Sequence, residues 1–216
     1  MTNGPSTVSP MAERRRSAGI LVAAAFAVVA TFIPGAWLEL RPEASLLRMV
    51  TCHFTHWSHE QLAWDALAFT ALGVACARRN ARATYATLFA SVLVIPMAVL
   101  AFAPEVGAYR GLSGVASAMF ALLLTLERKR LTWSAVTFAI LFASKLAFEA
   151  ITGGAVFAND MGDNVVAVPA AHLAGALVGV IGGYSIRTGA YFTWSGLLSA
   201  RESSRGSSES SSFSGG

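Results

Sequence analysis

The sequence predicts an all-α, polytopic membrane protein with six transmembrane helices. Of its 216 residues, 55% are hydrophobic and only 13% are charged, whereas a soluble domain of this size carries about 25% charged residues. The mean hydropathy is +0.56, and the apolar residues form blocks of about 20, the length that crosses a hydrocarbon core. These observations exclude a soluble globular enzyme, a disordered protein and a disulfide-stapled secreted domain.

The basic residues indicate a membrane topology rather than a nucleic-acid partner. The formal net charge is +4, but twelve of the 16 Lys and Arg residues fall in alternate connections between the apolar blocks or in the tails. These are Arg14, Arg15, Arg16, Arg78, Arg79, Arg82, Arg128, Lys129, Arg130, Arg187, Arg201 and Arg205. Because basic residues are retained on the cytoplasmic side of a membrane, we expect both termini to be cytoplasmic.

The apolar blocks divide the chain into a membrane domain, 18–186, and two cytoplasmic tails, 1–17 and 187–216. We expect spans at about 18–38, 59–77, 83–103, 111–126, 132–151 and 165–186. The first block is longer than a signal-peptide core and is expected to be retained. The second tail is rich in Ser and Gly and is expected to be disordered from about residue 201. Cys52 and Cys76 fall toward opposite sides of the membrane, which excludes a disulfide between them.

The fourth span is too short to cross the bilayer alone. The 16 residues from Gly111 to Leu126 rise about 24 Å as a helix, against a hydrocarbon core of about 30 Å. Pro104 and Gly107 precede this span, which places the missing depth on the outer side. Since backbone at that depth must not face lipid, we expect a loop to enter the membrane and start this helix below the outer surface.

Three polar residues are expected at one level inside the membrane. Counted up from the cytoplasmic ends of their spans, Ser113, His172 and Asp65 lie at about 20, 21 and 18 Å at a rise of 1.5 Å per residue. All three would then lie roughly 10 Å below the outer face of a bilayer core about 30 Å thick. Polar groups at this depth are costly and mark function, and their convergence is the geometry that a buried active site needs.

The neighbours of Ser113 and His172 favour nucleophilic catalysis. Gly111 and Gly114 flank the segment Gly-Leu-Ser-Gly at the predicted start of a helix, where free N–H groups can bind an oxyanion. Gly175 and Gly179 follow His172 at a spacing that lets another helix pack closely. A serine needs a base to become a nucleophile, and a nearby histidine supplies one.

These motifs resemble the two halves of the rhomboid intramembrane serine protease site. The segment from His56 to Asp65, with its Trp-Ser and Trp-Asp pairs, resembles the family's second-helix element. The resemblance covers residues 18–186 and implies a six-helix rhomboid-like bundle. It also implies Ser113 as the nucleophile and His172 as the general base, in a dyad without a carboxylate and without a cofactor or metal.

Three positions depart from the usual rhomboid pattern. Asp65 stands where many members have an asparagine that helps to form the oxyanion hole, Gln61 where a histidine is usual, and Ser117 where an aromatic residue often packs against the catalytic histidine. An ionised Asp65 would repel an oxyanion, so it is either protonated or has another role. Gln61 can still donate a hydrogen bond through its amide.

The compact layout and Trp64-Asp65 resemble the rhombosortase branch of the family. That resemblance implies cleavage of a peptide bond in or near the transmembrane segment of a single-span membrane protein, with a C-terminal Gly-Gly sorting segment as one such substrate. The small size of such a protease suggests a bacterial inner membrane, and the gap above the short fourth span predicts a site that opens to the outer face. The expected partners are therefore the lipid bilayer and this substrate.

Two other functions remain open from the sequence. The substitutions at Gln61, Asp65 and Ser117 are compatible with a catalytically inactive relative that binds membrane clients. A metal- or haem-binding membrane protein is the less favoured alternative, suggested by a set of histidines at three-residue spacing. These are His53, His56 and His59.

Lys145 and Glu149 form one more polar pair inside a span. They lie four residues apart on the fifth span, a spacing at which side chains meet on one helix face. We interpret them as a structural ion pair, or as residues beside an opening between the second and fifth spans.

Overall fold

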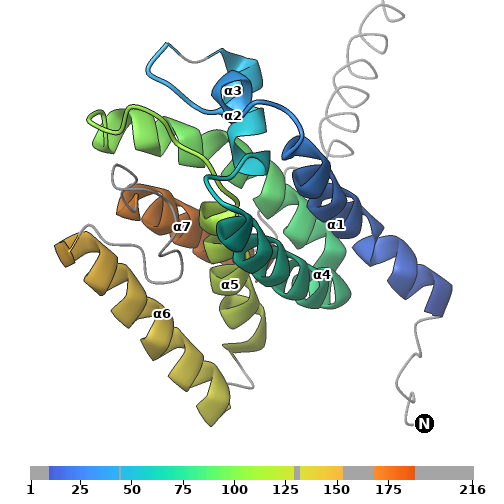
Figure 1. Ribbon diagram of the computed structural model, residues 1–216. Helices are drawn as coiled ribbons and strands as arrows, with labels where there is room; N and C mark the ends of the chain where they lie inside the picture. Colours follow the sequence, from blue (N-terminus) through green and yellow to red (C-terminus); the bar gives the residue numbers. More distant parts are fainter. Residues whose placement is uncertain (1–9, 44, 129–131, 153–167, 188–216) are drawn as a thin grey trace, which may run out of the picture. The chain divides into compact units, whose positions relative to one another are not determined.

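The described part of the chain is all-α, as predicted. The computed structural model describes residues 10–43, 45–128, 132–152 and 168–187, and within these residues it contains helices and one isolated β-bridge. The helices are α1 (Pro10–Ala30), α2 (Gly35–Leu38), α3 (Leu46–Thr51), the 3₁₀ turn η1 (Cys52–Phe54), α4 (His59–Phe102), α5 (Ser113–Glu127), α6 (Trp133–Thr152) and α7 (Pro169–Arg187) (Figure 1). By their contacts, the described residues up to Tyr184 form one unit.

The first helix lies earlier in the chain than the expected span at 18–38. It begins at Pro10, since proline is well tolerated at the first helical position. It ends at Ala30, and the next N–H groups, from Thr31 onward, make tighter bonds to carbonyls three residues back. Pro34 lacks an N–H and disfavours helix at the residue before it, which explains why α1 stops and the short α2 follows.

The second and third expected spans form one assigned helix, α4, with a break inside it. Asn80 has φ −155° and ψ 93°, far from helical values, at the turn predicted for 78–82. Its side-chain Oδ1 accepts a hydrogen bond from the N–H of Ala83 at 3.0 Å, which caps the second half of α4. Among the described residues, α4 is the one helix that is long and apolar enough to cross a membrane, and α5 is a shorter apolar helix.

The remaining helices lie close to their predicted positions. Helix α5 was expected at 111–126, α6 at 132–151 and α7 at 165–186, and each begins or ends a few residues from those limits. Residues 165–167 and the tail from 188 onward lie outside the described residues. The short helix α2 falls at the end of the expected first span, and α3 and η1 fall in the connection between the first two expected spans.

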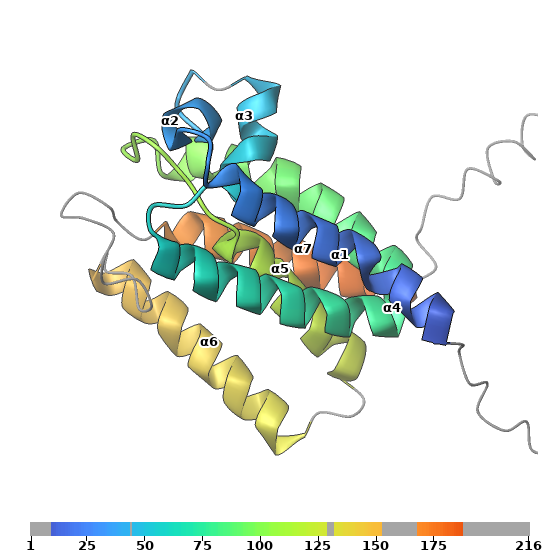
Figure 2. The ribbon, with the colours of Figure 1, turned by 45° about the vertical axis from the view of Figure 1, so that its right-hand side comes forward.

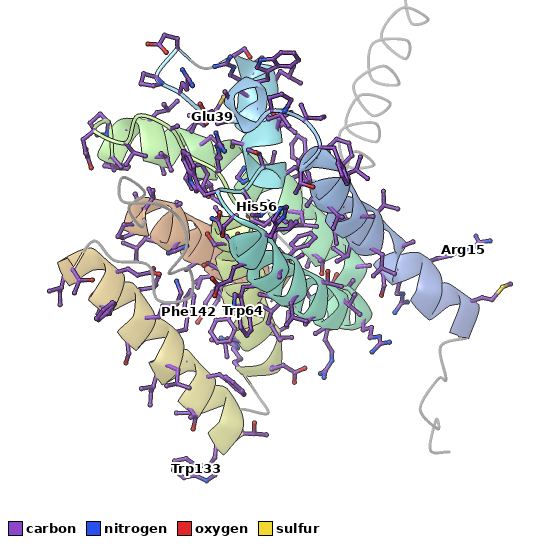
Figure 3. The ribbon with its side chains drawn as sticks, in the orientation of Figure 1. Arg15, Glu39, His56, Trp64, Trp133 and Phe142 are labelled. Carbon is purple, nitrogen blue, oxygen red and sulfur yellow. The ribbon has the colours of Figure 1, made fainter. Side chains whose placement is uncertain are left out.

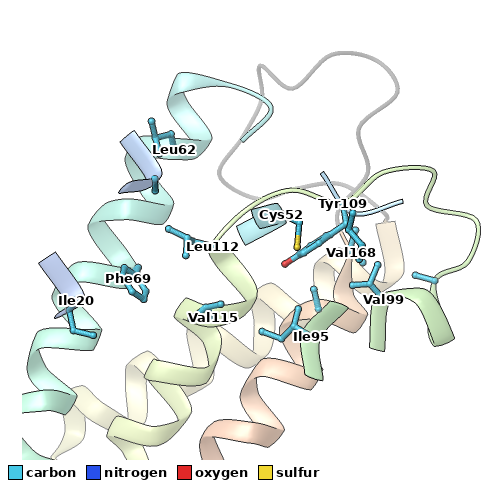
Figure 4. Packing of buried hydrophobic residues seen from close by; sticks show 14 residues of the cluster. Ile20, Cys52, Leu62, Phe69, Ile95, Val99, Tyr109, Leu112, Val115 and Val168 are labelled. Atoms are coloured by element: carbon cyan, nitrogen blue, oxygen red, sulfur yellow. The ribbon is translucent and has the colours of Figure 1, made fainter. Parts of the chain in front are cut away.

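The hydrophobic core surrounds the first turn of α5. Leu112 and Val115 are almost fully buried, and they pack in one cluster with Phe69 and Ile95 from the two halves of α4 and Ile20 from α1 (Figure 4). Figure 2 shows α5 running alongside α4 and α7. Helix α5 therefore starts inside the packed part of the molecule. Both cysteines are free and buried, which confirms that they do not pair.

Candidate active site

Ser113 and His172 lie side by side. Ser113 is the first residue of α5 and is partly exposed, whereas His172 lies in the first turn of α7 and is only 6% exposed. The Nε2 atom of His172 is 2.9 Å from the Oγ atom of Ser113, within hydrogen-bonding distance. The structure thus brings together the two residues predicted to be nucleophile and base.

The close approach of α7 to α5 depends on two glycines. A Cβ atom at Gly175 would overlap the carbonyl oxygen of Gly114, and a Cβ atom at Gly179 would overlap that of Ala118. The partners are backbone atoms of a buried helix, which cannot move aside as a flexible side chain would. The predicted packing role of Gly175 and Gly179 therefore positions the helix that carries His172.

The loop before α5 needs a glycine at its last turn. Gly111 has φ +122°, a conformation that residues with a Cβ rarely adopt. Its N–H donates to the carbonyl of Cys52 at 3.0 Å, and Tyr109 exchanges two backbone hydrogen bonds with Leu40. These bonds hold the loop against the segment before α4 and direct it into the start of α5.

Gln61 lies on the first turn of α4 with its amide aimed at this loop. Its Oε1 atom accepts a hydrogen bond from the N–H of Trp57 at 2.8 Å. Only the amide oxygen can accept that bond, so the NH₂ group faces the other way, 2.9 Å from where a Cβ of Gly111 would lie. Gln61 therefore presents two N–H donors beside the backbone that leads into Ser113.

Asp65 supports the backbone at the start of α5. Its Oδ2 atom accepts a hydrogen bond from the N–H of Leu112 at 3.1 Å, and the same oxygen lies 3.4 Å from Nε2 of His56. Leu112 is the residue that caps α5, and its N–H has no acceptor within the helix. Of the two roles left open for Asp65, this geometry favours the one that does not involve the oxyanion.

The three spaced histidines have separate environments, and His53 has a structural one. His53 is fully buried, with its Nε2 atom 3.3 Å from the carbonyl oxygen of Val92. That carbonyl lost its helical partner because Pro96, four residues later in α4, has no N–H. Burial lowers the pKa of His53 from 6.5 to about 4, so the ring is neutral at physiological pH and can donate to this carbonyl.

The other two histidines do not join His53. His56 contacts Asp65 at the start of α4, where Figure 3 labels it, and His59 is exposed on the first turn of that helix. The described residues contain no group of three or more His, Cys, Asp or Glu side chains that could hold a metal ion. The geometry thus gives the metal or haem alternative no support in this part of the chain.

A buried ion pair outside the helices holds the same loop region together. Glu39 is 2% exposed and accepts hydrogen bonds from Arg110 at 2.8 and 2.5 Å and from Arg41 at 2.6 Å. Burial acts to raise the pKa of Glu39, but the two guanidinium groups outweigh it and hold that pKa below 4.5. Arg110 also lies 4.0 Å above the ring of Trp57. These contacts join the loop before α5 to the segment before α4, and they were not predicted from the sequence.

Glu149 is the site residue that sequence reasoning missed. Its Oε2 atom lies 2.9 Å from Nδ1 of His172, and its Oε1 atom accepts a hydrogen bond from Lys145 at 2.6 Å. An Nδ1–H bond would not be aligned on the carboxylate, so this short contact does not meet the geometry of a hydrogen bond. Counting along the fifth span places Glu149 about 26 Å above its cytoplasmic end, about 5 to 8 Å above the levels counted for Ser113, His172 and Asp65.

Together, these residues define a serine–histidine site in a helical protein whose helices are rich in apolar side chains. The chain matches a model of the Rhomboid domain over residues 43–189, more than half of its length. It therefore belongs to the rhomboid family, whose members are intramembrane serine proteases or inactive relatives of them, and it is a membrane protein. A comparison with curated proteins finds no match.

Proposed function

We propose that this chain is an active intramembrane serine endopeptidase with Ser113 as its nucleophile and His172 as its general base. The observation that carries the proposal is the 2.9 Å distance between Ser113 Oγ and His172 Nε2. A general base must lie within about 2.6–3.2 Å of the atom that bears the proton to be removed, and this pair meets that condition without rearrangement.

The reaction would proceed by acyl transfer. As Ser113 Oγ attacks the carbonyl carbon of the scissile peptide bond, its proton passes to Nε2 of His172. His172 then returns this proton to the departing amine, which leaves an ester between Ser113 and the substrate. A water molecule then attacks the ester carbonyl while His172 takes its proton. His172 passes that proton to Ser113 Oγ as the acyl group leaves as a carboxylic acid, which restores the enzyme.

Gln61 and the start of α5 would bind the oxyanion. The NH₂ group of Gln61 is free to donate beside Gly111, and the first N–H groups of α5 have no acceptor within the helix. Asp65 occupies the N–H of Leu112 and thereby keeps the turn before Ser113 in place.

A cavity near the start of α4 supports entry of water from that end of the site. Its volume is about 450 Å³, and residues 31–35, 55–59 and Arg110 line it. His56 belongs to this lining and also contacts Asp65. Asp65 in turn accepts a hydrogen bond from Leu112, the residue before Ser113. A polar, roomy cavity of this kind can hold water.

The finer assignments follow from the sequence. We assign six membrane spans, with α4 supplying two of them on either side of Asn80, cytoplasmic termini, and a site that opens toward the outer face of a bacterial inner membrane. We assign single-span membrane proteins as substrates, and the rhombosortase branch with its Gly-Gly sorting segments from the Trp64-Asp65 pair. Trp64 is 51% exposed.

Labelling with a fluorophosphonate probe tests the proposal. Purified wild-type protein is expected to label, and Ser113→Ala and His172→Ala are expected to abolish labelling. Ser117→Ala is the matched control, because this serine lies one turn further along α5 and its hydroxyl donates to the carbonyl of Ser113; it should still label. Labelling that survives Ser113→Ala would identify another nucleophile, and a folded wild type that neither labels nor cleaves would favour an inactive client-binding relative.

Cleavage of a reporter tests the substrate class. A single-span protein that ends in a Gly-Gly segment, a membrane helix and a basic tail should be cut in liposomes by wild type and not by Ser113→Ala. Replacing the two glycines of the reporter by alanine should slow cleavage if the rhombosortase assignment is correct. Equal cleavage of both reporters would show that the protein is a protease that does not recognise the Gly-Gly segment.

A further inference from the structure

We infer that Glu149 is a positioning residue that completes a Ser–His–Glu triad in this site, where the family resemblance implies a dyad. The inference rests on the proposed function, because it assigns Glu149 a role in the reaction of Ser113 and His172.

Three helices contribute a continuous chain of polar contacts. Lys145 Nζ on α6 is 2.6 Å from Glu149 Oε1, and Glu149 Oε2 is 2.9 Å from His172 Nδ1 on α7. His172 Nε2 is in turn 2.9 Å from Ser113 Oγ on α5. The two nitrogens of one imidazole thus contact a carboxylate and a hydroxyl, which is the order of groups in a serine protease triad.

The burial of Glu149 is not explained by its pairing with Lys145 alone. Most described side chains of α6 are exposed, among them Trp133 and Phe138, whereas Glu149 is 2% exposed. A buried carboxylate is costly unless each of its oxygens finds a partner. Lys145, at 22% side-chain exposure, meets one oxygen, and within the described part of the chain the other oxygen meets His172. An ion pair that served α6 alone would not need this second contact.

A carboxylate at Nδ1 performs two tasks for the base. It favours the tautomer with the proton on Nδ1, which leaves the lone pair of Nε2 directed at the hydroxyl of Ser113. It also stabilises the imidazolium that forms when His172 takes the proton of Ser113, without taking that proton itself. The Nδ1–H bond is not aligned on Oε2 in this structure, and catalytic hydrogen bonds in unliganded enzymes commonly tighten only when substrate binds.

Helix α6 brings Glu149 to the site through contacts on one face. Phe142 points from α6 toward α5 (Figure 3), and its ring centroid lies 4.9 Å from that of Phe120. Phe142 and Glu149 are seven residues apart, two helical turns, and therefore share a face of α6. The aromatic contact and the carboxylate contact thus hold the same side of this helix against α5 and α7.

The test compares Glu149→Gln and Glu149→Asp with Glu127→Gln in the full chain. Glu127 is the matched control because it too pairs with a cation, Arg79, but at the far end of α5. We expect Glu149→Gln to lower the rate of fluorophosphonate labelling by up to about 10⁴-fold, the loss that the corresponding replacement causes in a serine protease triad, with a thermal midpoint close to that of wild type. Glu149→Asp should recover part of the rate, and Glu127→Gln should label as wild type does.

Nitrogen NMR of ¹⁵N-histidine protein adds a readout that does not depend on the probe. The chain has four histidines, and a His172→Asn variant identifies the signals of His172. In its neutral form, wild-type His172 should carry its proton on Nδ1, and Glu149→Gln should populate the other tautomer. The proposed function itself fails if wild type shows no labelling that depends on Ser113, and the tautomer measurement still decides the role of Glu149 in that case.

Two results would overturn the inference. One is a folded Glu149→Gln protein that labels at the wild-type rate and keeps the wild-type tautomer. The other is a fall in labelling that is accompanied by a lower thermal midpoint, with the tautomer of His172 unchanged. This result would mean that Glu149 supports the fold alone.

Discussion

Helix α5 is held in place differently on its two sides. On the side of α7, the helices approach closely because Gly175 and Gly179 have no Cβ atom, which lets α7 lie directly on the α5 backbone. On the side of α4 and the loop before α5, the position is set by directional polar contacts. The N–H of Leu112 donates to Asp65, and the N–H of Gly111 donates to the carbonyl of Cys52, in the turn that the His53–Val92 contact holds against α4. A steric contact fails when an atom is added, whereas a polar contact fails when a donor or acceptor is removed. The predictions below test this difference.

The largest effect is expected for Gly175→Ala. The added methyl group would overlap the carbonyl oxygen of Gly114 and force α7 away from α5. A displacement of about 1 Å of a catalytic group can cost about 100-fold in rate, so we expect fluorophosphonate labelling of Ser113 to fall by about 100-fold or more. Labelling rate and thermal midpoint in detergent micelles are the measurements.

Gly107→Ala is the control for the added methyl group. A Cβ at Gly107 would meet nothing within 4 Å, and this glycine has no positive φ. Its labelling rate and thermal midpoint should match those of wild type. If Gly175→Ala behaves like Gly107→Ala, α7 does not depend on the missing side chain.

On the polar side, His53→Ala is expected to lower the free energy of unfolding by about 1–3 kcal/mol. The substitution leaves the carbonyl of Val92 buried without a donor, and an unsatisfied buried group costs about this amount. Restoring the helical donor should reduce the loss, because in a Pro96→Ala background the N–H at position 96 can bond to Val92. A double-mutant cycle on unfolding measures this coupling. Equal losses in both backgrounds would show that His53 does not act through the Val92 carbonyl.

The same histidine predicts a pH dependence of stability. Its pKa is about 4 in the folded protein against 6.5 for an unperturbed ring, so the unfolded chain binds the extra proton first. Stability contributed by the neutral ring is complete above pH 6.5 and is lost as the pH falls toward 4. Between pH 7 and pH 5 the loss should be about 2 kcal/mol, and His53→Gln should remove this slope. An unchanged slope in that variant would assign the pH dependence to other groups.

The Ser113–His172 pair could be predicted from the sequence because the fixed rise of a helix converts a residue count into a depth. Counting residues along each span placed both side chains at one depth, and the glycines that follow His172 indicated which helix packs closely. Depth says nothing about the direction in which a side chain points around its helix. For this reason Glu149 was interpreted as part of a pair with Lys145, although it also contacts His172.

The parts that the sequence did not predict depend on contacts between distant segments. The short helices α2, α3 and η1 have too few residues to show a periodic pattern, and they are held by bonds such as that of Gly111 to Cys52. The need that His53 meets could be predicted from the sequence. A proline inside a helix leaves the carbonyl four residues earlier without a donor, but the sequence does not say which side chain supplies one.

The smallest effect, and the sharpest test of the polar side, is expected for Asp65→Asn. An asparagine oxygen can still accept the N–H of Leu112 at this position, so labelling of Ser113 should stay within about threefold of wild type. Asp65→Ala removes the acceptor, leaves a buried N–H unpaired and should lower labelling about tenfold, the equivalent of about 1.4 kcal/mol. If the negative charge of Asp65 were essential, for example to hold His56, Asp65→Asn would lose as much as Asp65→Ala. A gain in labelling on Asp65→Asn would instead indicate that the carboxylate repels the oxyanion and that its support of Leu112 comes at a cost to the reaction.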